Sequence, residues 1–134
     1  MITIHGVYRS RGSRNIWLLE EIGRPWRLEA VTQAYRLADP AAPGAPRNTR
    51  SRDFLALSPQ GAVPVMQDGD LVLSESLANN LYLARTYGGD LGPRNAVEDA
   101  LMQQWALYGA TAVEPSALLL MYAYMEGKAG TPEG

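Results

Sequence analysis

The spacing of apolar residues changes twice within the first thirty positions. Residues 2–7 are rich in β-branched side chains and predict a short strand. Over residues 13–22 the large apolar side chains recur at helical spacing, and Gly23 follows where a helix commonly ends. Residues 26–31 return to a strand pattern. Strand, helix and strand within about thirty residues are typical of a βαβ unit, whose two strands lie parallel.

A second group of elements follows further along the chain. Residues 63–66 and 71–73 are apolar runs on either side of an Asp-Gly turn, which predicts a β-hairpin. We expect Ser74 or Ser76 to cap a helix that runs to about Tyr87. The elements together predict an α/β fold in which a four-stranded mixed sheet carries helices.

A proline-rich loop, residues 37–53, separates these two groups. It carries Arg47, Arg50 and Arg52, and residues 54–57 then fit a short helix. Clustered charges in a loop usually face solvent. A contact with an anionic ligand is the alternative for these arginines.

The last part of the chain has a helical pattern only. Residues 91–94 form a linker, and residues 96–108 are followed by Pro115, which is expected to break or kink the helix before a second piece that ends at about Met125. One broken helix cannot bury its own apolar side chains. We therefore expect exposed apolar surface along residues 96–125.

Composition excludes several classes of function. Of 134 residues, 46% are hydrophobic and 19% charged, and the formal net charge is −2, so the chain lacks the basic field of a nucleic-acid binder. Cysteine is absent, which excludes disulfides and cysteine-based metal sites or nucleophiles. The only histidine, His5, is expected to be a strand residue that faces away from the core. No apolar run is long enough to span a membrane, and no signal peptide is evident, so we expect a cytoplasmic protein.

Four stretches carry a resemblance to a known family. They are YRSRGSRNIWLLEEIG, FLALSPQGAVPVM, LVLSESLANNLYLARTYG and the LGP linker, in this order. With this order and spacing the chain, from Met1 to about Met125, resembles a glutathione S-transferase. The resemblance implies a thioredoxin-like glutathione-binding domain over residues 1–88. It also implies that residues 89–134 are the linker and first helices of a truncated helical domain.

The family likeness also sets the expected activity. It implies a cytoplasmic detoxification enzyme that binds glutathione as co-substrate, uses no metal and transfers the glutathione thiolate to a small hydrophobic electrophile. It further implies a homodimer, while the net charge and the short apolar runs lead us to expect no nucleic-acid or membrane partner. Family members are usually longer, and the missing helices normally supply much of the electrophile pocket. A non-catalytic binding or scaffold module of the same fold is therefore the alternative.

Ser10 is the candidate catalytic residue. It lies between the first strand and the first helix, where a hydroxyl and a helix N-terminus can both stabilise a thiolate. The match to serine-type family members indicates the same position. Tyr8 and Arg11 are the neighbouring rivals for the thiol contact. Ser10 could instead only cap the helix, although Ser13 could take that role.

Val63 and Pro64 are expected to bind the peptide part of glutathione. A proline at the start of a strand lacks the N–H needed for the sheet. By the resemblance, the Val63–Pro64 bond is cis, and the Val63 backbone pairs with the cysteinyl residue of glutathione as an added strand. An ordinary trans proline in an edge strand is the alternative. Many family members have a basic residue before the valine, where this chain has Ala62, so Gln60 or a loop arginine is expected to hold the glycine carboxylate.

Glu75 and Ser76 are expected to bind the γ-glutamyl end of glutathione. A serine at a helix N-terminus suits a carboxylate, and a glutamate suits an ammonium group. The family match places both residues at this end of the ligand. A plain helix cap with an acidic first turn is the alternative.

Overall fold

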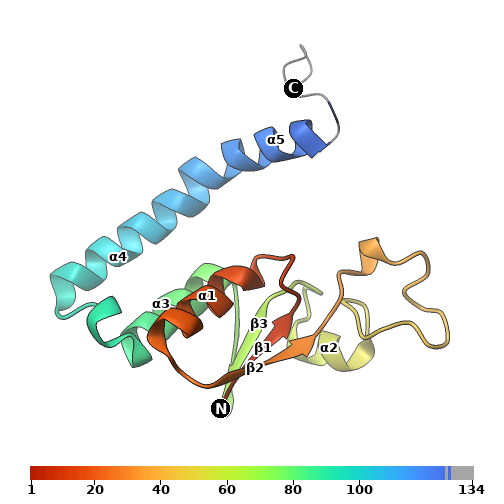
Figure 1. The fold of residues 1–134 in the computed structure, drawn as a ribbon, viewed down its shortest axis with the longest axis horizontal. Coiled ribbons are helices and arrows are strands. Elements are labelled where there is room, and N and C mark those ends of the chain that lie inside the picture. Colours follow the sequence, from red (N-terminus) through yellow and green to blue (C-terminus); the bar gives the residue numbers. More distant parts are fainter. Residues whose placement is uncertain (126, 128–134) are drawn as a thin grey trace. The chain divides into compact units, whose positions relative to one another are not determined.

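A computed structural model describes residues 1–125 and residue 127 (Figure 1). The chain divides into two compact units between Gly92 and Pro93. The first unit contains a sheet and the second is helical, so each is described by itself.

The first unit is built on a four-stranded mixed sheet, as expected from the sequence. Its strands are β1 (Ile2–Gly6), β2 (Trp26–Ala30), β3 (Val65–Asp68) and β4 (Leu71–Ser74), in the order β2-β1-β3-β4. β1 and β2 are parallel, whereas β1–β3 and β3–β4 are antiparallel. The predicted βαβ unit and hairpin are therefore both present.

Two helices, α1 (Gly12–Ile22) and α3 (Ser76–Tyr87), lie side by side on one face of the sheet (Figure 1). The main core lies between them and the strands and is formed by Ile2, Ile4, Ile16, Leu19, Met66 and Leu83. These side chains come from alternate strand positions and from one face of each of the two helices, so the apolar spacing changes where a strand gives way to a helix.

The opposite face of the sheet has a smaller core. Helix α2 (Arg52–Leu57) contributes Phe54, which packs with Val31 and Val65. The rest of this face carries polar side chains, including His5 of β1. Two short 3₁₀ turns, η1 (Ala34–Arg36) and η2 (Gly89–Leu91), complete the unit.

The start of α3 differs from the sequence expectation. Glu75 occupies the N-cap position, and no side chain caps the helix there. Ser76 is the first helical residue and Ser74 ends β4, so the expectation that either serine caps this helix is wrong. The sequence pattern located the helix but not the role of each serine in its first turn.

The second unit contains α4 (Ala96–Tyr108), a π-helical turn (Gly109–Val113) and α5 (Glu114–Met125). Asn95 caps α4, because its side chain accepts hydrogen bonds from the amides of Val97 and Glu98. The expected irregularity near Pro115 is the π-helical turn, since proline supplies no N–H for a regular helical bond.

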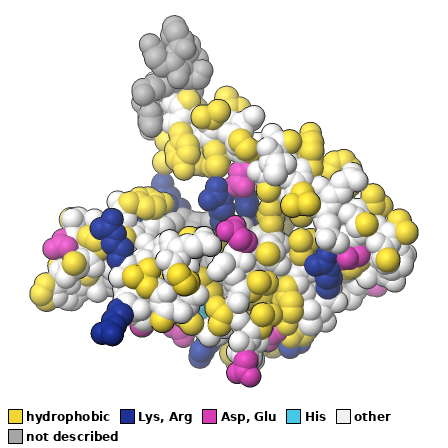
Figure 2. Space-filling view, turned by 180° about the vertical axis from the view of Figure 1, so that it is seen from behind, with side chains coloured by type: hydrophobic (Ala, Val, Ile, Leu, Met, Phe, Trp, Pro, Cys, Tyr) yellow, Lys and Arg dark blue, Asp and Glu magenta, His cyan; other side chains and the backbone are white. Residues whose placement is uncertain are grey.

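Apolar side chains of the second unit are widely exposed, as expected. Trp105 is 62% and Leu119 72% exposed, and hydrophobic side chains gather along this helical segment (Figure 2). Among the described residues, no helix is both long and apolar enough to cross a membrane.

Candidate functional site

The candidate site begins where the chain leaves β1 and enters α1. The Ser10 hydroxyl donates a hydrogen bond to the carbonyl of Val7 at 2.6 Å and accepts one from the amide of Gly12 at 3.0 Å. The Ser13 hydroxyl instead donates to the carbonyl of Ser10 at 3.0 Å. The expectation that Ser13 could satisfy the helix start is therefore wrong, because the Ser10 oxygen does so.

This arrangement defines what Ser10 can do chemically. Its oxygen already holds a helix amide, and its hydrogen is directed at a backbone carbonyl. Rotation about the Cβ–Oγ bond would free that hydrogen for a ligand anion without breaking the bond from Gly12. Ser10 can therefore cap the helix and donate to an anion at once.

Val63 and Pro64 lie beside Ser10. A Cβ atom added to Gly6 would be 3.7 Å from both the Ser10 Oγ and the Val63 Cβ. A Cβ atom on Gly12 would be 3.1 Å from the Ser10 Oγ and 3.4 Å from the Pro64 Cβ. The two buried glycines thus let the serine and the Val-Pro pair approach each other closely.

The Val63–Pro64 peptide bond is cis, as expected. β3 starts at Val65, and its pairing with β1 begins at Val65 and His5. Val63 therefore lies just outside the hydrogen-bonded ladder of the sheet, at the end of the strand nearest to Ser10.

Ser76 is connected to the same end of α1 through two side chains. The guanidinium of Arg14 donates to the Ser76 hydroxyl at 3.1 Å, and the amide of Asn15 donates to the Ser76 carbonyl at 2.7 Å. Ser76 and Asn15 are both buried. These contacts join the first turn of α1 to the first turn of α3.

Glu75 has an unusual backbone conformation, with φ 69° and ψ 110°. A positive φ is uncommon for a residue with a Cβ atom and is found often at functional sites. The carbonyl of Glu75 accepts a hydrogen bond from the backbone amide of Asn79 at 2.9 Å, and the Glu75 side chain is exposed. The conformation directs the chain sharply from β4 into α3.

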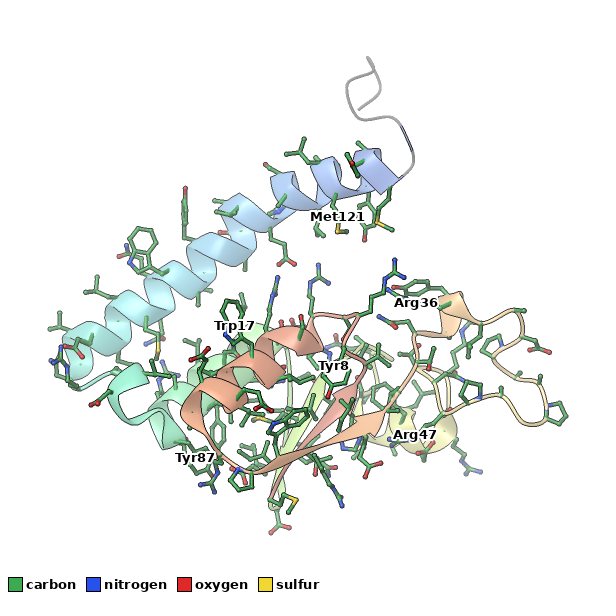
Figure 3. All side chains as sticks on the ribbon, viewed as in Figure 1. Tyr8, Trp17, Arg36, Arg47, Tyr87 and Met121 are labelled. Carbon is green, nitrogen blue, oxygen red and sulfur yellow. The ribbon has the colours of Figure 1, made fainter. Side chains whose placement is uncertain are left out.

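The remaining predicted residues lie on exposed turns. Tyr8 is 64% exposed, and both Tyr8 and Arg11 lie near the start of α1. For orientation, Tyr87, at the end of α3, lies far from Tyr8 (Figure 3). Gln60 is exposed in a turn that the Gly61 amide closes on the Ser58 carbonyl at 2.8 Å. The structure therefore gathers Ser10, Val63 and Pro64, links Ser76 to them through α1, and places Gln60 on the turn that leads to Val63.

Several contributing residues were not predicted. Arg14 and Asn15 contact Ser76, and the side chains of Gln33 and Arg36 both donate to the carbonyl of Arg9, at 3.3 Å and 3.2 Å. The spacing of apolar residues shows which face of α1 meets the core, but it gives no information on the polar residues next to that face. It could therefore not distinguish the buried Asn15 from a surface residue.

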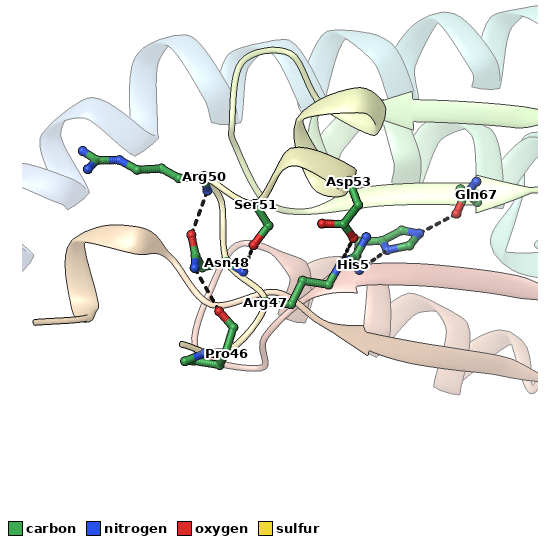
Figure 4. Close-up of polar contacts among 8 residues, drawn as sticks. All are labelled: His5, Pro46, Arg47, Asn48, Arg50, Ser51, Asp53 and Gln67. Atoms are coloured by element: carbon green, nitrogen blue, oxygen red, sulfur yellow. Dashed lines mark hydrogen bonds and ion pairs between the residues drawn. The ribbon is translucent and has the colours of Figure 1, made fainter. Parts of the chain in front are cut away.

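His5 lies on the polar face of the sheet and is buried (Figure 4). It faces away from the main core, as expected, but it is covered by other side chains. Its Nε2 lies 2.5 Å from Gln67 Oε1 and its Nδ1 lies 3.2 Å from Arg47 Nη1. Because arginine can only donate, Nδ1 accepts and Nε2 carries the hydrogen. Burial lowers the pKa of His5.

The loop arginines differ from one another. Arg47 is half-buried and pairs with Asp53 at 2.5 Å, whereas Arg50 and Arg52 are exposed. The expectation of a solvated arginine cluster is therefore wrong for Arg47, which the neighbouring His5 and Asp53 draw onto the sheet. No group of three or more potential metal-ligating side chains is found in the described part of the chain.

Comparison with known proteins gives a consistent result. A model of the N-terminal domain of glutathione S-transferases matches residues 10–86. Glutathione S-transferase 2 of Anopheles gambiae is 34% identical over 88 residues, which are 63% of this chain and 42% of that protein. Glutathione S-transferase 3 of Schizosaccharomyces pombe is 28% identical over 117 residues, covering 86% of this chain and 43% of that protein. The chain thus spans less than half the length of these curated relatives.

Solved structures share the fold. The theta class glutathione S-transferase of Xanthomonas axonopodis pv. citri, solved with glutathione bound, has a TM-score of 0.69 and 32% identity, covering 85% of this chain and 50% of that one. Glutathione transferase F2 of Populus trichocarpa has a TM-score of 0.72 and 24% identity, covering 91% of this chain and 54% of that one.

Proposed function

The chain belongs to the glutathione S-transferase family, and from this membership we propose that it binds glutathione and transfers the glutathione thiolate to a hydrophobic electrophile. The observation that carries the proposal is the close approach of Ser10 to Val63 and Pro64 at the N-terminal end of α1. A thiol seated there meets a hydroxyl donor and the N-terminal end of α1.

Thiol ionisation is the chemical step that this site assists. A free thiol has a pKa of about 8.5, so most of it is protonated at neutral pH. A hydrogen bond donated by Ser10 stabilises the thiolate over the thiol, and the positive end of the helix dipole adds to this effect. The thiolate sulfur then attacks the electrophilic carbon, a C–S bond forms, and the leaving group departs with its electron pair.

The rest of glutathione is held by groups on either side of Ser10. The Val63 backbone, outside the sheet ladder, pairs with the cysteinyl main chain. Ser76 and the first amides of α3 bind the γ-glutamyl carboxylate, and Glu75 binds its ammonium group. Gln60 binds the glycine end, while Tyr8 and Arg11 border the thiol.

In this proposal the helical second unit forms the interface between two copies of the chain. Its exposed apolar side chains, such as Trp105 and Leu119, favour a homodimer. We place the protein in the cytoplasm, where glutathione is available. The alternative function is a non-catalytic glutathione-binding or scaffold module that keeps the same site.

Two measurements test the proposal. Calorimetric titration with reduced glutathione is expected to give a dissociation constant between micromolar and millimolar, which corresponds to roughly −8 to −4 kcal/mol. The pKa of the bound thiol, followed by thiolate absorbance, is expected to fall below that of free glutathione. Ser10→Ala should remove this fall, whereas Ser13→Ala, the matched control, should keep it.

The results of these measurements distinguish a transferase from a scaffold module. A folded protein that releases no heat with glutathione contradicts the binding proposal. Binding without turnover of several hydrophobic electrophiles favours the scaffold module. An unchanged thiol pKa in Ser10→Ala rules out the role given to Ser10.

A further inference from the structure

The Arg47 side chain joins segment 46–50 to the polar face of the sheet, beside a second group of contacts around the buried Asn48 (Figure 4). Arg47 reaches His5 with one guanidinium nitrogen, at 3.2 Å, and pairs with Asp53 through another, at 2.5 Å. The guanidinium also lies 5.8 Å from the centre of the Phe54 ring. Arg47 therefore connects the segment to β1 and to α2 at the same time.

The backbone of this segment is paired with residue Thr32. The Thr32 amide donates to the carbonyl of Arg47 at 3.0 Å, and the amide of Thr49 donates to the carbonyl of Thr32 at 2.9 Å. The Thr49 hydroxyl accepts a hydrogen bond from the amide of Ala34 at 3.0 Å. A displacement of Arg47 therefore acts directly on residues 32–34.

Residues 33–36 in turn hold the loop that contains Ser10. The side chains of Gln33 and Arg36 both donate to the carbonyl of Arg9, the residue before Ser10. The Gln33 amide oxygen is buried and has no hydrogen-bond partner among the described residues. The hydrogen bond from the side-chain nitrogen of Gln33 to the carbonyl of Arg9 is therefore the contact by which the Gln33 amide group holds this loop.

The His5 ring accepts from Arg47 only while it is neutral. Protonation places a second hydrogen on Nδ1, which would then face the guanidinium of Arg47. The hydrogen-bond acceptor would become a donor, and two positive charges would lie in contact. The neighbouring strand β2 contributes Glu29, which pairs in register with His5 and favours the imidazolium, and Arg27, which opposes it. β3 contributes the neutral Gln67, whose oxygen can accept from either form.

We propose that His5 is a proton-sensitive latch that holds segment 46–50 while neutral and releases it when protonated, so that acid loosens the Ser10 loop and weakens ligand binding. The exposed carboxylate of Asp53 gives the released Arg47 a partner in solvent, since its side chain is 63% exposed. The effect on ligand binding rests on the proposed glutathione site. The release of the segment itself does not.

Amide hydrogen exchange on the intact protein tests the latch directly. After correction for the intrinsic pH dependence of exchange, the amides of Thr32 and Thr49 should exchange about tenfold faster at pH 5 than at pH 7.5, because they open with the segment. The amide of Leu83, in the main core, is the internal control and should not change. Nitrogen NMR of the single histidine should show the Nε2–H form at neutral pH and follow its titration.

The variant His5→Gln provides the comparison. Its amide oxygen can accept from Arg47 and does not titrate, so Thr32 and Thr49 should stay protected at both pH values. Asp53→Asn, which keeps His5, should retain the pH effect. Equal exchange at both pH values in the unmodified protein, or an equal acid effect in His5→Gln, would overturn the latch.

Glutathione affinity separates the latch from the proposed function. From pH 7 to pH 5 the affinity of the unmodified protein is expected to fall about fivefold beyond any fall caused by the bound thiol and the carboxyl groups, which His5→Gln shares. His5→Gln should lose this additional fall. If glutathione does not bind at either pH, the proposed glutathione site is contradicted, and the exchange test of the latch still stands. If segment 46–50 opens in acid but affinity does not change with pH, the link between the latch and ligand binding is contradicted.

Discussion

The guanidinium of Arg14 donates a hydrogen bond to the buried hydroxyl of Ser76, from the first turn of one helix to the first residue of another. The contact orients the hydroxyl and places positive charge beside the N-terminus of α3. An anion bound at Ser76 therefore meets a donor, a helix end and a neighbouring cation together.

Replacement of Arg14 should weaken glutathione binding. For Arg14→Met we expect an affinity loss of about tenfold, because a hydrogen bond to a charged group contributes about 1.5 kcal/mol or more. Calorimetric titration measures this loss. Arg52→Met, which changes an exposed arginine on α2, is the control and should bind as the unmodified protein does. Equal affinities for the two variants would remove Arg14 from the site.

Gly12→Ala should displace Ser10 from Pro64. The added Cβ atom would lie 3.1 Å from the Ser10 Oγ and 3.4 Å from the Pro64 Cβ, so we expect glutathione affinity to fall more than tenfold. The same contacts should lower the free energy of unfolding by about 1–3 kcal/mol, because the added methyl group displaces packed neighbours. Titration and urea unfolding measure the two quantities.

The control for that prediction lies in the helical second unit. Gly109→Ala adds a Cβ atom with no heavy atom within 4 Å and should leave affinity unchanged. Full affinity in Gly12→Ala would show that ligand binding does not depend on the position of Ser10 beside Pro64.

Two glycines with the same sign of φ should differ in their response to alanine. Gly69 has φ 58° with no heavy atom within 4 Å, so Gly69→Ala should cost only the backbone strain of about 1–2 kcal/mol. Gly61 has φ 61°, and its added Cβ atom would lie 2.9 Å from the carbonyl oxygen of Thr49. Gly61→Ala should therefore lower the free energy of unfolding by more than Gly69→Ala, as measured in urea. Equal losses would contradict the close approach of the Gly61 turn to residue 49.

The contact between Tyr87 and Asp68 should affect stability at both ends of the pH scale. Tyr87 donates to the Asp68 carboxylate, which raises the pKa of Tyr87 to about 12 and holds the pKa of Asp68 below its usual value. A raised tyrosine pKa adds stability that is present below pH 10 and is lost as pH rises towards 12. A lowered aspartate pKa adds stability that is present above about pH 4 and is lost as pH falls below it.

Tyr87→Phe should therefore destabilise the protein at neutral pH and flatten its pH dependence. We expect a loss of about 1 kcal/mol at pH 7, the net contribution of one hydrogen bond. The slope of stability between pH 10 and pH 12 should decrease, as measured by thermal unfolding across the pH range. Tyr8→Phe, at an exposed tyrosine, is the control. An unchanged slope in Tyr87→Phe would contradict the assignment.

Much of the fold was predictable because apolar spacing reports which side faces a core. The strands around Ile4 and Met66 and the helix around Leu19 were located to within one or two residues. The hairpin was predictable from its Asp-Gly turn, where Gly69 has positive φ. The first turn of α3 was not predictable. Ser74 and Ser76 are equally suitable N-cap residues, and nothing in the sequence indicates the positive φ of Glu75.

The candidate site was predictable only where a motif carried it. Ser10 and the Val63–Pro64 pair are recognisable from family spacing, and the structure places them together. Arg14 was missed because its role depends on the distance between two helices, which no local pattern records. The burial of His5 was missed for a similar reason, since the residues that cover it lie more than forty positions away in the sequence.

Gly6 and Gly12 give the site an evolutionary asymmetry. Both residues are buried close to Ser10 and Pro64, so every substitution at either position adds atoms to a packed contact. Mutation at these two positions can only displace those neighbours. The exposed side chains of Tyr8 and Gln60 have room for other sizes, so drift in ligand preference is expected to accumulate on the exposed turns while the two glycines stay as they are.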